Sequence, residues 1–188
     1  MIRRMAEPLP KPWTLDDFLA WEEQQPERFE FVDGVVRMMV GGTAAHSLIA
    51  VNLISWLHAR LRGSGCHAFT GDMKVIATAT GEGAYPDVSV TCRPFAPSDT
   101  AITEPMLIAE VLSRSTADRD RGGKFEMYKA IPSLRYYLLI SQDRRTVDLY
   151  RRTAEGWDLT RAAGAAEVDL PELGCRVPLD AIYAGVVV

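Results

Sequence analysis

Apolar and polar positions alternate along the chain in blocks that predict an ordered series of strands. Short apolar runs bounded by turn residues are typical of strands. Such runs lie near residues 66–70, 73–78, 86–92, 106–112, 135–141 and 145–151. A tight hairpin is predicted over 30–38, because Asp33-Gly34 supplies the positive φ angles of a two-residue turn. Beyond residue 152 the pattern indicates only short strands.

Three segments carry an apolar stripe at helical spacing. The first follows Thr14, a residue type that caps helix starts, and the second covers residues 46–62. The third, residues 117–131, joins two apolar strands, which is the pattern of a crossover helix in an α/β sheet. The main irregular connection is residues 93–105, too short to separate two domains. The chain is therefore predicted to form one α/β domain over residues 1–188.

Two charged residues interrupt this pattern at positions where the neighbours are apolar. Glu110 lies inside Met106–Leu112, a run whose two faces are both apolar, and a buried carboxylate is costly without a partner. Steps of 100° along the third helix place Lys124 on the same face as Tyr128 and Ile131. A buried acid and a buried ammonium on consecutive elements predict a charged site within the core. The alternative is a structural ion pair.

A second acid, Asp87, follows Pro86 at the start of a predicted strand. Alone, Pro-Asp is a common turn pair. If Asp87 lies beside Glu110, the pair indicates a cation site, because two neighbouring carboxylates repel each other unless a cation binds between them. Carboxylate oxygens with open water positions suit Mg²⁺ or Mn²⁺. With an added ammonium, the set fits metal-assisted hydrolysis of a phosphodiester.

Composition narrows the class of protein only slightly. The 188 residues are 47% hydrophobic and 24% charged, as in ordinary soluble proteins. No apolar run is long enough to cross a membrane, and the start lacks a secretory signal, so we expect a cytoplasmic protein. Cys66, Cys92 and Cys175 are odd in number and are predicted to be free thiols in a reducing compartment. The net charge of −4 does not by itself indicate nucleic-acid binding.

The chemistry-bearing residues occur in an order and spacing that resemble a known family. The matching positions are Pro86-Asp87, Glu110-Val111-Leu112-Ser113, Ser115-Thr116, Asp120, Lys124 and Tyr128. They resemble the Uma-two family of endonucleases, part of the restriction-endonuclease-like, PD-(D/E)xK superfamily, and the likeness covers nearly the whole chain. It implies a mixed central β-sheet flanked by helices. It also implies that Asp87, Glu110 and the backbone carbonyl of Val111 hold the metal ion.

One departure from the superfamily pattern concerns its lysine, which would fall at Leu112. A leucine cannot contact water or phosphate, so Lys124 is the expected substitute, delivered by the following helix. The resemblance implies that Glu30 is a further acidic member of the site. The sequence pattern around Glu30 alone would instead predict a solvated residue on an edge strand. Asp120, one turn before Lys124, is expected to orient the ammonium. His46 is expected mainly to start its helix.

The resemblance implies an endonuclease that hydrolyses DNA with Mg²⁺ or Mn²⁺. Three arginines around the crossover helix are candidates for phosphate contacts: Arg114, Arg119 and Arg121. They could equally be solvated surface residues. A homodimer is expected if both strands are cut, since that needs two sites. The runner-up is a non-catalytic binding module of the same fold, favoured by the acidic charge and by Leu112. A hydrolase using Ser113 or Ser115 with His46 lacks any nucleophile-elbow pattern.

Overall fold

The computed structural model describes residues 12–39, 41–113 and 120–188. Its helices are α1 (Leu15–Glu22), α2 (Ala44–Arg60), α4 (Gly123–Lys129), α5 (Leu179–Ile182) and the short 3₁₀ helix η1 (Pro171–Leu173). The strands of the first half are β1 (Phe29–Val32), β2 (Val35–Met38), β3 (His67–Thr70), β4 (Lys74–Ala77), β5 (Glu82–Ala84) and β6 (Val88–Thr91). Those of the second half are β7 (Ala101–Ile102), β8 (Leu107–Leu112), β9 (Tyr136–Ser141), β10 (Thr146–Arg152), β11 (Trp157–Ala163), β12 (Glu167–Leu170) and β13 (Cys175–Pro178).

The larger sheet is six-stranded and mixed, in the order β11-β10-β9-β8-β6-β3. Its central pair, β8 and β9, is parallel, and its other neighbouring pairs are antiparallel. Parallel neighbours need a crossover, and α4 lies in the connection between these two strands. The predicted mixed α/β architecture is therefore confirmed.

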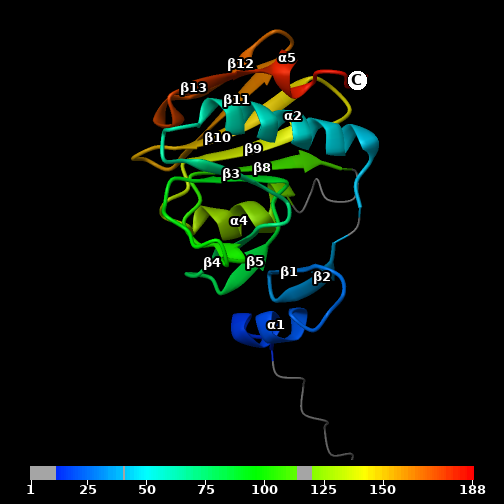
Figure 1. Ribbon diagram of the computed structural model, residues 1–188, viewed down its shortest axis with the longest axis vertical. Coiled ribbons are helices and arrows are strands. Elements are labelled where there is room, and N and C mark those ends of the chain that lie inside the picture. The colour runs from blue at the N-terminus through cyan, green and yellow to red at the C-terminus, as the bar shows by residue number, and fades with distance from the viewer. Residues whose placement is uncertain (1–11, 40, 114–119) are drawn as a thin grey trace, which may run out of the picture.

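Helices cover both faces of this sheet, with α2 above and α4 below it in Figure 1. From α2, Ile49, Leu53 and Leu57 pack into one core cluster, which also contains Ala109 and Val111 of β8. The other cluster contains apolar residues of α4 together with Ile108 and Leu112 of β8. Successive side chains of a strand point to opposite faces. Glu110 consequently shares the face of Ile108 and Leu112 and points toward α4.

The smaller sheet is five-stranded, in the order β2-β1-β5-β4-β7. It contains the predicted hairpin, where Asp33 and Gly34 have φ angles of 54° and 69°. The α1 helix covers it, with the Phe18 and Phe31 rings stacked at 5.4 Å between centroids. The chain passes from β5 of this sheet to β6 of the larger sheet through residues 85–87. The Pro86-Asp87 pair therefore lies where the two sheets meet.

The crossover helix is interrupted where the sequence pattern predicts one continuous helix. The pattern indicates helix over 117–131, and residues 120–121 are helical, but Gly122 breaks the helix with φ −107° and ψ −102°, and α4 then runs from Gly123 to Lys129; residues 117–119 lie outside the described part. The hairpin turn lies against this break, because a Cβ at Gly123 would come 2.1 Å from Asp33 Oδ2. A larger residue at position 123 would require the exposed Asp33 carboxylate to turn aside.

The prediction of free thiols is wrong for Cys66 and Cys92, which form a disulfide. The register of β3 and β6 pairs His67 with Thr91, so the two cysteines are the next pair outward, with Cα atoms 3.9 Å apart. Cys175 is free and buried. Across the described ranges, none of the helices combines the length and apolar character required to cross a membrane.

Candidate active site

The predicted site residues meet at the junction of the two sheets. Glu30 comes from β1 of the smaller sheet and Glu110 from β8 of the larger one. Asp87 belongs to the segment that links the sheets, and Lys124 lies in the first turn of α4. Four separate segments of the chain therefore contribute to one location.

Glu110 is buried, as the apolar run around it requires. Its Oε1 accepts hydrogen bonds from Lys124 Nζ at 3.0 Å and from the Tyr128 hydroxyl at 3.2 Å. Burial raises the pKa of Glu110 well above its usual range, and the charges of Asp120, Asp87 and Glu30 raise it further, while Lys124 opposes the shift. The Glu110 carboxyl group therefore lies among other acids, and its cationic partner is the Lys124 ammonium group.

Lys124 connects the two sheets through its ammonium group. Besides Glu110, its Nζ lies 2.7 Å from Glu30 Oε1 and 3.6 Å from Asp120 Oδ1. Burial alone would lower the pKa of Lys124, but the charges of Glu110, Glu30 and Asp120 outweigh burial and raise it. The side chain therefore carries a positive charge at neutral pH. Lys124, rather than Leu112, supplies the cation of this site.

Asp87 is fixed beside Glu110 by a hydrogen bond from the backbone of Val111. The Val111 N–H donates to Asp87 Oδ2 at 2.7 Å, and His46 Nε2 lies 3.2 Å from the same oxygen. The hydrogen bond with Asp87 is the main reason that the pKa of His46 is raised, although burial opposes it. His46 thus does more than start α2. It places an imidazole ring against the second acid.

Among the described residues of this cluster, acids outnumber cations. The buried or half-buried acids are Glu30, Asp87, Glu110 and Asp120; Lys124 pairs with Glu30, Glu110 and Asp120, and the His46 imidazole pairs with Asp87. An excess of carboxylate oxygens favours a hard divalent cation. Within the described ranges, however, no three His, Cys, Asp or Glu side chains are already grouped so that they could hold a metal ion. A site built from Asp87, Glu110, the Val111 carbonyl and waters would still match Mg²⁺, which binds through one or two carboxylates and keeps several waters.

These residues line a pocket of about 670 Å³. Its described lining comprises Glu30, Met38, Met39, Gly41, Gly42, Thr43, His46, Tyr85, Asp87, Glu110, Val111, Ser113, Asp120, Lys124, Gln142 and Asp143. The pocket gives the acids access to solvent although most of them are buried. A substrate group could therefore approach the cluster from outside.

Several lining residues carry no recognisable sequence signal. Gln142 accepts from the Thr43 hydroxyl at 2.6 Å and donates to the Leu112 carbonyl at 2.9 Å, which ties the start of α2 to the end of β8. The Tyr85 N–H donates to Glu30 Oε1 at 3.3 Å. Gly42 lies so close to His46 that a Cβ would approach its Nδ1 to 2.8 Å. In the sequence, only the Gly41-Gly42 pair before α2 could have indicated the contact between Gly42 and His46.

Other candidates fall elsewhere. Arg114, Arg119, Ser115 and Thr116 lie outside the described residues, whereas Arg121 is exposed near the start of α4. Tyr128 is buried and, through its bond to Glu110, is a neighbour of the site as well as a core residue.

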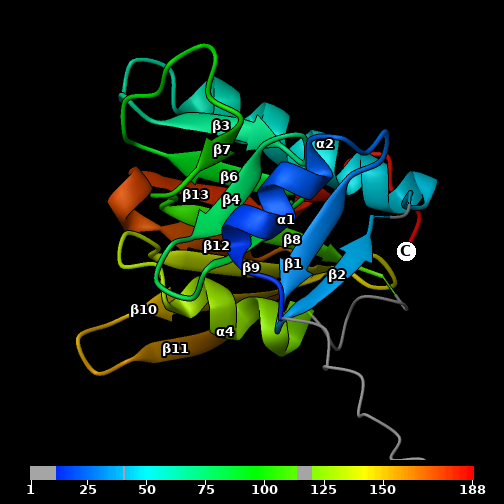
Figure 2. The same ribbon diagram turned by 90° about the horizontal axis from the view of Figure 1, so that it is seen from below.

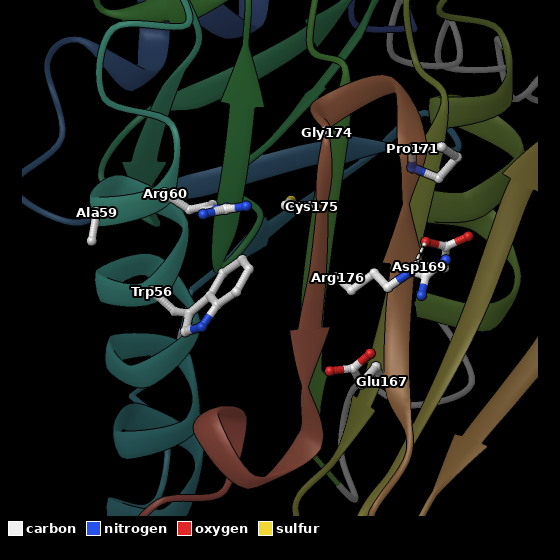
Figure 3. A pocket seen from close by; sticks show the side chains of 9 residues that line it. All are labelled: Trp56, Ala59, Arg60, Glu167, Asp169, Pro171, Gly174, Cys175 and Arg176. Atoms are coloured by element: carbon white, nitrogen blue, oxygen red, sulfur yellow. Dashed lines mark hydrogen bonds and ion pairs between the residues drawn. The ribbon is translucent and has the colours of Figure 1, made fainter.

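A second cleft, of about 750 Å³, lies between α2 and the β12–β13 hairpin (Figure 3). Trp56 and Arg60 line one wall, and the opposite wall includes Asp169 and Arg176, whose side chains pair at 3.0 Å. It contains no buried group of acids around an ammonium among its described lining. Its size alone does not make it the better candidate, so we assign the chemistry to the pocket at the sheet junction.

Comparisons with known proteins bear on the family and the fold. The model of the Uma2 family, described as "Putative restriction endonuclease", matches residues 15–179. Two relatives from Synechocystis sp. are "Uncharacterized protein slr1290", 38% identical over 95% of this chain and 94% of its own, and "Uncharacterized protein sll1609", 35% identical over 83% and 91%. The fold is similar to the crystal structure of a "putative nuclease belonging to DUF820" from Anabaena variabilis. That match has a TM-score of 0.76 and 19% identity, and it covers 94% of this chain and 100% of the other.

Proposed function

Since the chain belongs to the Uma2 family, whose description reads "Putative restriction endonuclease", we propose that it is a divalent-metal-dependent endonuclease that hydrolyses DNA phosphodiester bonds. The observation that carries the proposal is the convergence of Glu110, Glu30 and Lys124 from three elements, with Asp87 fixed next to them. Such a concentration of buried charge costs folding free energy, so a function is the simplest reason for it.

Asp87, Glu110 and the Val111 carbonyl would hold Mg²⁺ or Mn²⁺, with Glu30 contributing through water. When bound, the ion would supply Lewis-acid polarisation of the phosphoryl group and a more acidic water. The Val111 N–H and His46 both contact Asp87 Oδ2, so they orient this carboxylate before any ligand arrives. Because both contacts fall on Oδ2, the other carboxylate oxygen of Asp87 can act as the metal ligand.

Lys124 acts as an ammonium in this proposal. Its raised pKa makes proton abstraction from water unfavourable, so orienting the attacking water and offsetting charge on the transition state are its roles. Glu30 and Asp120 hold the ammonium in place. Arg121, exposed near the start of α4, is available for a phosphate contact. Cutting both strands would call for two copies of the site, and sedimentation analysis of the purified chain would test the predicted homodimer.

Plasmid cleavage tests the proposal directly. Purified protein with Mg²⁺ or Mn²⁺ should convert supercoiled plasmid to nicked or linear DNA, whereas Asp87→Ala and Lys124→Ala should not. Ser64→Ala, at an exposed turn after α2, is a suitable control for handling and contamination. Cleavage that survives both site substitutions would show that the assigned roles are incorrect.

A non-catalytic module of the same fold remains the second candidate, favoured by the lack of a ready three-residue metal cluster among the described residues. Metal affinity separates the two. A rise in thermal midpoint with millimolar Mn²⁺ that disappears in Glu110→Gln supports the enzyme, because the amide keeps the shape but loses the charge. Unchanged midpoints in the wild type favour the module.

A further inference from the structure

The pocket at the sheet junction has no uncommitted cation in its described lining with which to receive a phosphate. Its basic lining residues are Lys124 and His46. Lys124 is engaged by Glu30, Glu110 and Asp120, and His46 by Asp87. The carboxylates of this cluster would repel a polyanionic strand, except next to a bound metal ion. Positive charge outside the described lining would therefore help the strand to bind.

Arg37 is not part of the pocket lining, but the register of the β1–β2 hairpin places it beside Glu30, which is. It is the Cα partner of Glu30 across the strand pair, and directly opposed side chains of antiparallel strands share a face, about 5 Å apart. Glu30 points into the site, where its Oε1 contacts Lys124. Arg37 must therefore leave β2 on the side of the site.

Arg37 also has its hydrogen-bonding capacity available. It is exposed, and it makes no hydrogen bond or ion pair with any residue that the structure describes. Arg28, at the entrance of the same hairpin, differs because it pairs with Asp72 at 2.5 Å. Strand β2 is an outer edge of the smaller sheet, so nothing in that sheet lies beyond it (Figure 2). An extended ligand can pass along this edge.

We propose that Arg37 is a substrate-binding residue that contacts a backbone phosphate of the nucleic acid next to the bond being cut. The inference rests on the proposed nuclease function and adds a residue to it. A guanidinium suits this position because its planar fork can donate two hydrogen bonds to one phosphate. The contact carries no base information, so Arg37 sets affinity and strand position.

DNA binding measured by fluorescence anisotropy tests the assignment, with a labelled duplex and Ca²⁺ in place of Mg²⁺. Arg37→Ala should weaken binding about tenfold and reduce the slope of log affinity against log salt by about one. Arg37→Lys should restore the slope and only part of the affinity. In cleavage assays Arg37→Ala should raise KM with little change in kcat.

Arg62→Ala is the matched control. Arg62 is exposed, makes no pair with a described residue, and follows the far end of α2 from His46, roughly 20 Å along the helix axis. If both variants bind DNA like the wild type, or weaken it equally, the assignment to Arg37 is overturned. If the wild type neither binds nor cuts DNA, the proposed function itself fails, which is a distinct result.

Discussion

Replacing Lys124 with methionine should reveal how much free energy the buried charges hold. The side chain keeps a similar length, so the packing of α4 is largely preserved, while the three carboxylates within 3.6 Å lose their ammonium. Removing one partner of a buried pair costs about 3–5 kcal/mol. For a chain of this size the thermal midpoint should fall by roughly 10 °C.

Urea unfolding followed by circular dichroism, in the presence of a chelator, measures this cost. Lys129→Met is the matched control on the same helix, because the half-buried Lys129 pairs at 2.6 Å with the exposed Glu126. An exposed pair contributes only about 0–1 kcal/mol. Adding Glu110→Gln to Lys124→Met should recover part of the loss, since an amide is less costly to bury than an unpaired carboxylate. Equal costs for the two single lysine variants would refute the description of the site as a buried charge cluster.

Three further predictions concern other parts of the fold. Gly123→Ala should change stability in thermal unfolding by about 0.5 kcal/mol or less, because the added Cβ, 2.1 Å from Asp33 Oδ2, requires only that this exposed carboxylate turn aside, and Asp33→Gly in the same chain should remove any loss. Burial raises the pKa of Tyr183 to about 12. Its contribution to stability is therefore complete below about pH 10 and lost as the pH rises toward 12, a loss that Tyr183→Phe should lack in pH-dependent urea unfolding. Cys66→Ser should lower stability by about 3 kcal/mol under oxidising conditions. The difference from wild type should vanish in reductant, and a difference that persists there would contradict a role for the bond to Cys92.

Local patterning was sufficient to predict the central strands and the burial of two charges. Glu110 could be located because a strand buried on both faces must be apolar throughout, so one acid is conspicuous. Lys124 could be located because helical periodicity puts it on an apolar face. These arguments need only the residues within one element.

What the sequence could not show depends on the register between distant elements. Cys66 and Cys92 become neighbours only when β3 pairs with β6, and their spacing along the chain holds no trace of that. The break in the crossover helix at Gly122 lies where Asp33 of the hairpin approaches Gly123, a contact that the helix sequence alone does not indicate. Short β5, with a glycine at its centre, has no apolar run to indicate it.

The position of the Lys124 ammonium between Glu30 and Glu110 has a consequence for when activity can begin during synthesis. One acid emerges in the first sixth of the chain, and the other with its lysine follows some eighty residues later. A nascent or partly opened chain therefore lacks part of the proposed site. For a proposed DNA-cutting protein, this coupling would keep unfinished copies harmless to the genome of the cell that makes them.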